Sequence, residues 1–441
     1  MNDLLRPVRL VPLAFLLAVA VGALLLLLPV SRTDHSVSAL MPAAFTAVAA
    51  VCVTGLTVVD TATYWTPFGQ GVILGLVQVG GFGIMTLATL LASIVSGRLG
   101  LRSMLVTQTE THTTNLGDIR GLLRRVALTM LAFEAVLTLI LTVRFRIAYD
   151  NDLGTALWHG GFHAVSGFNS AGYSLFSDNL VGFVSDAWIC VTLSVAVIAG
   201  GIGFPVLNEL MRRTRPSRWT VHTRITVYGS LILLVAGIGG TLVLEWSNPG
   251  TFGPLSVPDK LTAATVTGSM PRTGGFNSID YGNAHAETLA ITNVLMFIGG
   301  GSGGTAGGIK VTTFFLLAFV ILAEIAGDRD VTVAHRRVPG QTQRQALTVA
   351  LLGVAVVAAG TLALLMISPY RFDLLLFEAT SAFSTAGLTT GITSTMTAPA
   401  HGVLMLLMFV GRVGTVTVAS ALALRSRQRL YQLPDERPIV G

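Results

Sequence analysis

The sequence predicts an all-α integral membrane protein with four pseudosymmetric repeats around a central ion pore, each made of a span, a pore helix, a filter loop and a second span. Three observations predict this fold. The composition is strongly apolar, eight segments are long and apolar enough to be transmembrane helices, and four short glycine-centred segments recur at nearly constant intervals.

The composition excludes a soluble globular protein. Of the 441 residues, 52% are hydrophobic and 11% are charged, and the mean hydropathy is +0.71. A soluble domain of this size needs more polar surface, whereas a bilayer needs apolar side chains on the outside of the protein. The two cysteines, Cys52 and Cys190, lie in apolar stretches and are too few for a disulfide framework or a cysteine metal site.

Eight apolar segments are predicted to cross the hydrocarbon core, which takes about 20 helical residues. They are 10–30, 71–96, 123–145, 187–210, 224–246, 288–325, 346–367 and 401–424. Within each successive pair lies a shorter segment, beginning near Pro42, Thr155, Asp259 or Asp373. These segments are too short to span, and we expect half-helices that enter and turn back, followed by irregular backbone that lines a cavity.

Each half-helix leads to one of the glycine segments, which are centred on Gly55, Gly167, Gly275 and Gly387 at intervals of 112, 108 and 112 residues. A second glycine motif follows each, ending 28, 36, 28 and 27 residues later. The predicted repeats are 1–97, 98–215, 216–328 with a broken second span, and 329–441 with a cytoplasmic C-terminal tail.

The distribution of positive residues predicts the orientation. Twenty arginines fall on the side of both termini and of the loops that join the repeats, and six Lys or Arg fall on the other side. The positive-inside rule places both termini in the cytoplasm. The net charge of +6 is thereby explained by topology and contact with membrane lipid, and a nucleic-acid partner is not expected.

The glycine segments carry the chemistry of the predicted filter. A dehydrated cation needs oxygens in place of water, and backbone carbonyls aimed at one axis supply them, while glycine permits the required backbone and has no Cβ to block the path. Pore-helix C-termini, with their partial negative charge, favour cations. The alternative is that these glycines serve only close helix packing. The predicted ion-binding residues are Val53, Thr54, Gly55, Val165, Ser166, Gly167, Thr273, Gly274, Gly275, Thr385, Ala386 and Gly387.

The sixth span is interrupted by seven glycines in ten residues, which predicts a loop in mid-membrane that opens or closes the path. The loop residues are Gly299, Gly300, Gly301, Ser302, Gly303, Gly304, Thr305, Ala306, Gly307 and Gly308. Lys310 follows, but the phosphate-binding pattern GxxxxGK[ST] is not matched. A kinked packing helix remains the alternative.

Lys310 and Arg412 are the basic residues placed within spans, where charges are costly unless they face water, an ion path or a partner. They either form an electrostatic barrier beside the ion path or bind loop carbonyls and hold the structure. His159 and His163 have the i, i+4 spacing of metal ligands, but no third ligand is evident, so structural roles are expected.

We do not expect an enzyme, because no nucleophile and base have supporting spacing. Two other function classes remain as alternatives: a secondary transporter for an organic solute, which also uses broken helices, and an intramembrane hydrolase using His163 and Ser166. Loss of transport on mutation of the glycine segments would favour the pore.

These residues resemble the Trk/Ktr/HKT superfamily of potassium transporters, specifically its Ktr-type membrane subunits. The resemblance covers nearly the whole chain and is most specific in the four glycine segments, in SGGTAGGIK at 302–310 and at Arg412. It implies a fourfold pseudosymmetric monomer that takes up K⁺ across the bacterial cytoplasmic membrane, with Na⁺ as a possible coupled ion.

The resemblance also implies a homodimer, a cytosolic ring of nucleotide-binding regulatory subunits of the KtrA/TrkA type, and gating by the glycine-rich loop with Arg412. In that family the four glycines coordinate potassium, and serine in place of the first is associated with sodium permeation. No organic cofactor is expected on this chain. Its cytoplasmic loops are too short for a regulatory domain, so the partner is expected to be a separate subunit.

Overall fold

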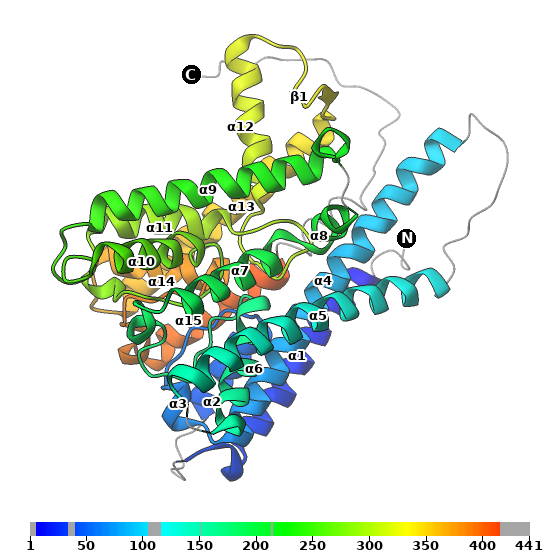
Figure 1. Ribbon diagram of the computed structural model, residues 1–441. Helices are drawn as coiled ribbons and strands as arrows, with labels where there is room; N and C mark the ends of the chain where they lie inside the picture. Colours follow the sequence, from blue (N-terminus) through cyan, green and yellow to red (C-terminus); the bar gives the residue numbers. More distant parts are fainter. Residues whose placement is uncertain (1–5, 34–39, 105–115, 151, 213–214, 415–441) are drawn as a thin grey trace.

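The protein is almost entirely helical (Figure 1). A computed structural model describes residues 6–33, 40–104, 116–150, 152–212 and 215–414. The helices that correspond to the predicted spans are α1 (Arg6–Leu27), α4 (Pro67–Met104), α5 (Leu116–Ala148), α7 (Ala187–Ile202), α9 (Val221–Glu245), α11 (Ala286–Ile298), α12 (Val311–Ala326), α13 (Gly340–Ile367) and α15 (Ala398–Phe409). The four predicted pore helices are α2 (Leu40–Val51), α6 (Leu153–Phe168), α10 (Val257–Ser269) and α14 (Phe372–Ser384).

Short elements join the helices. They are α3 (Thr61–Tyr64), α8 (Phe204–Met211), the 3₁₀ turns η1 (Pro29–Ser31), η2 (Val181–Phe183), η3 (Pro216–Arg218), η4 (Tyr281–Asn283) and η5 (Thr393–Thr395), and the π-helix η6 (Val410–Gly414). A hairpin of β1 (Thr332–Val333) and β2 (Arg336–Arg337), which the sequence did not predict, lies between α12 and α13.

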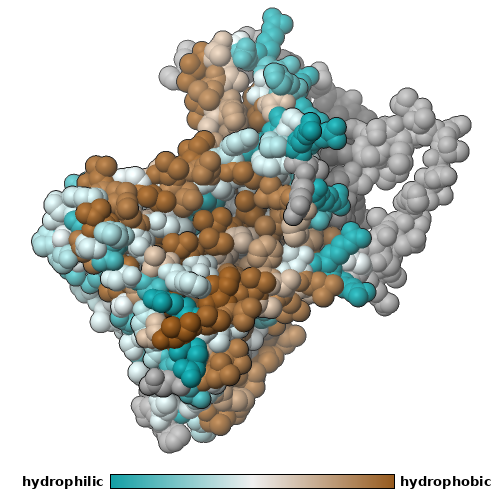
Figure 2. Space-filling model, in the orientation of Figure 1, coloured by the Kyte–Doolittle hydropathy of each residue, from teal (hydrophilic) through white to brown (hydrophobic). Residues whose placement is uncertain are grey.

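Several helices are long and apolar enough to cross a membrane. In the described chain these are Pro67–Thr86, Gly121–Ala148, Val221–Glu245 and Gly340–Ile367, with a fifth if the bent pair α7 and α8 forms one span. The other predicted spans correspond to shorter apolar helices, so the count of eight spans stays a prediction. Hydrophobic residues gather over the middle of the face shown in Figure 2, and hydrophilic residues gather toward its upper right edge.

The four pore helices begin within two residues of their predicted starts, and polar caps fix two of those starts. At α6 the Asp152 carboxylate accepts a hydrogen bond from the backbone N–H of Thr155 at 2.9 Å, which lowers the pKa of Asp152. At α10 the Ser256 hydroxyl accepts from the backbone N–H of Asp259. Each pore helix is 12 to 16 residues long, so none can span.

Three of the four second spans are irregular, although the sequence predicted a break only in the third. The first, α4, is continuous over its 38 residues. Between α7 and α8 the chain bends by 104° at Gly203, whose φ is 100°. The loop 299–310 separates α11 from α12, and α15 passes into the widened turn η6. These breaks lie at the second glycine motif.

The helices pack in a closed ring. Each pore helix contacts the long helix before it, in the pairs α1 with α2, α5 with α6, α9 with α10 and α13 with α14. Each also contacts a helix of a second predicted span, in the pairs α4 with α6, α7 with α10 and α11 with α14, and α15 with α2 closes the ring. Each pore helix is thereby held between two helices of the ring.

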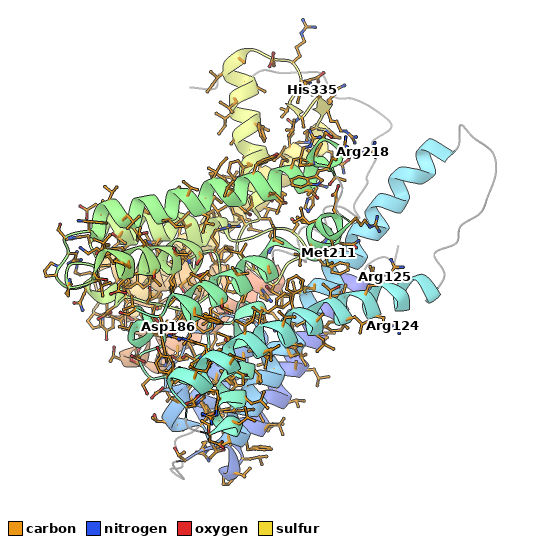
Figure 3. All side chains as sticks on the ribbon, in the orientation of Figure 1. Arg124, Arg125, Asp186, Met211, Arg218 and His335 are labelled. Atoms are coloured by element: carbon orange, nitrogen blue, oxygen red, sulfur yellow. The ribbon has the colours of Figure 1, made fainter. Side chains whose placement is uncertain are left out.

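Labelled basic residues gather toward one end of the molecule. Arg124, Arg125 and Arg218 lie there with His335, whereas Asp186 lies away from them (Figure 3). The three arginines belong to segments that the charge count put on one side, so their placement agrees with that distribution.

Candidate functional site

Four segments following the pore helices share one unusual backbone conformation. We call them strips 1 to 4, and they are residues 53–55, 170–172, 273–275 and 385–387. In each strip the first residue and the final glycine both have positive φ. The first residues are Val53 (56°), Ser170 (61°), Thr273 (71°) and Thr385 (51°), and the glycines are Gly55 (80°), Gly172 (71°), Gly275 (75°) and Gly387 (83°).

Helix termination produces this conformation. In strips 1, 2 and 4 the middle residue donates its backbone N–H five residues back, from Thr54 to Ala49 O at 2.7 Å, from Ala171 to Ser166 O at 2.7 Å and from Ala386 to Ser381 O at 2.8 Å. This is the Schellman end of a helix, in which the preceding residue is left-handed. Because left-handed Val, Ser and Thr are uncommon, the strained backbone marks these strips as a candidate functional site.

The structure corrects the predicted second strip. Val165, Ser166 and Gly167 lie inside α6, which continues to Phe168, and a Cβ on Gly167 would contact the side chains of Leu193 and Ala196. The strip begins only after that helix ends, so Ser170, Ala171 and Gly172 hold the position that the sequence analysis gave to 165–167. From Gly172 the second glycine motif ends 31 residues later, closer to the spacing of the other three.

Two buried side chains support this alignment independently. His163 and Glu378 each lie nine residues before the glycine of their strip. His163 Nε2 is 3.1 Å from Ser174 Oγ, two residues after Gly172. Glu378 Oε1 accepts from Thr389 Oγ1 at 2.8 Å, two residues after Gly387. The backbone N–H groups of Leu175 and Thr390 also donate to His163 Nε2 and Glu378 Oε1, at 3.4 and 2.8 Å, so each side chain holds the backbone that leaves its strip.

The strips contact one another in a closed cycle. A Cβ on Gly55 would collide with Ala171 O, and one on Gly172 would lie 3.0 Å from Gly274 O. The cycle continues to strip 4 and back to strip 1, because a Cβ on Gly275 would lie 3.1 Å from Ala386 O and one on Gly387 would collide with Thr54 O. At every strip the missing Cβ is what lets the carbonyl of the next strip approach.

A cavity of about 470 Å³ opens beside this cycle, and all four strip glycines line it. Three carboxylates also line it, those of Asp60, Asp178 and Asp280, each from the loop after a strip. These three carboxylates could not be predicted as a group from the sequence, because their loops approach one another only in the fold. The carboxylates make the mouth of the site negative, which concentrates cations there.

The segment 299–310, which we call the gate loop, has no regular structure and is almost wholly buried. Its carbonyls accept hydrogen bonds from three basic side chains. Lys310 Nζ donates to Ala306 O at 2.6 Å, Arg412 Nη1 donates to Thr305 O, and Arg272 Nε donates to Gly299 O at 3.4 Å. The gate loop is therefore the segment that brings these charges together.

Arg272 differs from its predicted place. The charge count put it on the outer side, but it is 8% exposed and donates also to Ser230 O and Ser230 Oγ, at 3.1 and 2.7 Å. It directly precedes strip 3, and thus joins that strip to the gate loop. Lys310 and Arg412 do bind loop carbonyls, which is one of the two roles that the sequence left open.

The gate loop lies against two strips. Thr305 Oγ1 is 2.9 Å from Ser170 Oγ in strip 2. A Cβ on Gly307 would collide with Ser384 O and with Thr385 Oγ1 in strip 4. The loop thus occupies the space at the side of the strips where the pore helices end.

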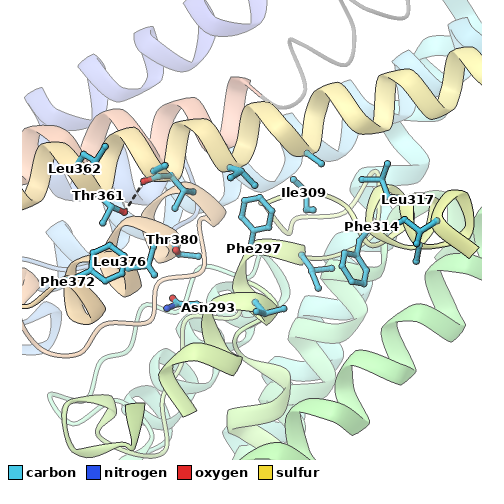
Figure 4. A pocket seen from close by; sticks show the side chains of 18 residues that line it. Asn293, Phe297, Ile309, Phe314, Leu317, Thr361, Leu362, Phe372, Leu376 and Thr380 are labelled. Carbon is cyan, nitrogen blue, oxygen red and sulfur yellow. Dashed lines mark hydrogen bonds between the residues drawn. The ribbon is translucent and has the colours of Figure 1, made fainter. Parts of the chain in front are cut away.

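On its other side the gate loop borders apolar space. A pocket of about 770 Å³ lies among α11, α12, α13 and α14, and Phe297 and Ile309 line it together with Phe314 and Leu376 (Figure 4). Phe297 also stacks on Phe383 of α14, with ring centroids 6.1 Å apart. One side of the loop is held by polar contacts, and the other meets a pocket with almost no polar lining.

The remaining predicted residues have structural partners. His159 Nδ1 is 3.0 Å from Asp150 Oδ2, and Ser166 Oγ donates to Tyr173 O at 2.8 Å, so Ser166 and His163 bind different groups. In the described residues, no group of three or more His, Cys, Asp or Glu could hold a metal ion. Cys52 and Cys190 are buried free thiols.

Comparison with known proteins identifies the family. Residues 15–430 match the TrkH family model, described as cation transport protein. The chain belongs to the TrkH family of cation transport proteins. It is accordingly a multi-pass membrane transporter and not an enzyme.

Three relatives extend over nearly the whole chain. The Ktr system potassium uptake protein B of Bacillus subtilis is 37% identical over 99% of this chain and 97% of its own. The protein of the same name from Vibrio alginolyticus is 33% identical over 98% and 94%. The potassium/sodium uptake protein NtpJ of Enterococcus hirae is 32% identical over 99% and 98%.

The fold matches a solved structure as well. The potassium transporter TrkH from Vibrio parahaemolyticus superposes with a TM-score of 0.72 over 93% of this chain and 83% of that one, at 18% identity. The match shows that the fold is that of an all-helical membrane protein, and the family model with the three relatives confirms the family resemblance stated from the sequence.

The corrected alignment of strip 2 predicts unequal effects of two glycine substitutions. Gly172→Ala adds a Cβ against strip 3 at a left-handed position, which costs about 1–2 kcal/mol before any steric overlap. We expect cation flux in proteoliposomes to fall at least about tenfold. Gly167→Ala is the matched control, since it only crowds two side chains, and it should keep flux within about twofold. A larger loss of flux in Gly167→Ala than in Gly172→Ala would instead support 165–167 as the second strip.

The negative mouth predicts an effect that depends on ionic strength. Asp178 is exposed at the cavity, and Asp178→Asn should raise the half-saturating cation concentration about twofold in low salt. Added choline chloride should remove the difference, because the Debye length falls to about 3 Å at 1 M. Asp330→Asn, at the hairpin, removes the same charge elsewhere and should have no effect on flux. A salt-independent effect of Asp178→Asn would argue against concentration of cations.

Proposed function

We propose that this transporter takes up potassium ions through a single-file path formed by strips 1 to 4, which belong to four pseudosymmetric repeats around that path. The names of its relatives support K⁺ as the ion, with 37% identity to a potassium uptake protein and 32% to a potassium/sodium uptake protein. The repeats would run over 1–97, 98–215, 216–328 and 329–441, and the fourth would end in a cytoplasmic tail.

One observation carries the proposal, the cyclic contact of the four strips. In this cycle each glycine lies against the carbonyl that precedes the glycine of the next strip. Such carbonyls can replace the hydration shell of a cation. The pore-helix C-termini and the carboxylates of Asp60, Asp178 and Asp280 add negative potential on the same path.

In this proposal the gate loop closes the path, and its release opens it. Its hydrogen bonds to Lys310, Arg412 and Arg272 hold the closed position, which keeps three positive charges beside the path. The apolar pocket beside Ile309 offers space next to the loop.

The assembly follows from kinship with the Ktr system. We propose a homodimer in the bacterial cytoplasmic membrane with both termini cytoplasmic. A cytosolic ring of nucleotide-binding subunits would release the gate loop by binding the arginine-rich segments around Arg124, Arg125 and Arg218, which lie at one end of the molecule. Coupling to Na⁺ would make K⁺ uptake in proteoliposomes rise with external Na⁺.

Flux measurements with K⁺ and Na⁺ varied separately test the proposed function. Purified protein in proteoliposomes, assembled with its cytosolic ring subunits, should carry K⁺ in preference to Na⁺. Gly55→Ser should lower the K⁺/Na⁺ flux ratio at least about tenfold, because the added Cβ displaces Ala171 O from the path. Absence of K⁺ flux from folded protein would refute the proposal.

Gly75→Ser is the control for that substitution. Gly75 lies in α4, and a Cβ there meets nothing within 4 Å. Its flux ratio should equal that of the unmodified protein. An equal loss of selectivity in Gly55→Ser and Gly75→Ser would exclude strip 1 from the filter.

A further inference from the structure

The hydroxyl groups of the strips differ in one respect. Within the described chain, Thr54, Thr273 and Thr385 have hydroxyl oxygens that are buried and without a hydrogen-bond partner. Ser170 is different, because its Oγ lies 2.9 Å from Thr305 Oγ1. Strip 2 is thus the strip whose side chain forms a hydrogen bond with the gate loop.

Thr305 connects the gate loop to several elements at once. Its backbone N–H donates to Gly200 O of α7 at 3.1 Å, and its carbonyl accepts from Arg412. Its Oγ1 donates to Phe168 O, the last carbonyl of α6, at 3.2 Å. Because that bond uses the proton of Thr305, the hydroxyl of Thr305 accepts the proton of Ser170.

The residue before Ser170 is held by a different group of side chains. Asn169 Nδ2 donates to Gln78 Oε1 and to Glu134 Oε1, both at 3.0 Å. Gln78 Nε2 in turn donates to Glu134 Oε2 at 3.0 Å. These partners belong to α4 and α5 and not to the gate loop. Asn169 is therefore fixed to the scaffold, and Ser170 is the residue of strip 2 whose side chain the loop holds.

We propose that Ser170 and Thr305 form a coupling pair through which the gate loop holds strip 2 in its ion-selective conformation. This inference rests on the proposed function. Thr305 is bonded to Gly200 of α7 and to Phe168 of α6, so it stays in place when residues 306–310 leave the path, and the pair persists in the conducting state. Without the pair, Ser170, a left-handed residue that is not glycine, loses the bond that holds its side chain, and strip 2 relaxes.

The experiment is a double-mutant cycle on selectivity. Ser170→Ala, Thr305→Val and the double variant are reconstituted in proteoliposomes, and K⁺ and Na⁺ fluxes are measured for each. Each single variant should lower the K⁺/Na⁺ ratio about threefold to tenfold, the range expected for one lost hydrogen bond. The double variant should be no less selective than the singles, because both remove the same interaction.

Two further variants separate coupling from general damage to the loop. Ser302→Ala removes the hydrogen bond between Ser302 Oγ and Thr312 Oγ1, 3.1 Å apart, and leaves the pair intact. It should change total flux and keep the flux ratio. Thr305→Ser keeps the hydroxyl and should retain selectivity, which a purely steric role of the methyl group would not permit.

Several outcomes would overturn the coupling pair. These are unchanged selectivity in both single variants, losses that multiply in the double variant, and a Ser302→Ala ratio as low as that of Thr305→Val. Flux through the unmodified protein separates failure of the coupling pair from failure of the proposed function. If it carries K⁺ selectively while the pair fails these tests, only the coupling is wrong, whereas absence of K⁺ flux overturns the proposed function and the coupling with it.

Discussion

The close approach of each strip glycine to the next strip's carbonyl is the constraint on which the site depends. A side chain at Gly55, Gly172, Gly275 or Gly387 would take the space of that carbonyl or of the neighbouring strip's backbone. The left-handed residue at the start of each strip is then a consequence, since the helix must end abruptly for the chain to reach the centre. Buried side chains such as His163 and Glu378 hold the departing backbone in place.

Much of this arrangement could be predicted from sequence, because it depends on length and local composition. The pore helices are too short to span and lead to glycine, so their starts were predicted within two residues. The second strip was predicted at the wrong residues because the sequence GFNS occurs both at 167–170 and at 275–278. The better guide was the pattern of a hydroxyl residue, alanine and glycine, which Ser170-Ala171-Gly172 shares with Thr385-Ala386-Gly387.

Features that depend on tertiary contacts could not be predicted in this way. From its position in the sequence, between two predicted spans, Arg272 was predicted to lie on the outer side of the membrane. The packing of α9 against α10 instead brings its side chain to Ser230 and to the gate loop. The carboxylates at the cavity come from three loops far apart in sequence. The second glycine motifs that end at Gly203 and Gly414 lie where the helix is bent or widened. The corresponding motif of the first repeat lies in the continuous helix α4, and its local sequence does not show this difference.

The central claim is that carbonyls from the four strips bind the transported cation. Crystals soaked in Rb⁺ or Tl⁺ test it most directly, since both ions replace K⁺ and scatter anomalously. We predict an anomalous peak at the centre of the cycle, within coordination distance of oxygens from all four strips. A peak confined to the carboxylates of the mouth, with none among the strips, would contradict the account.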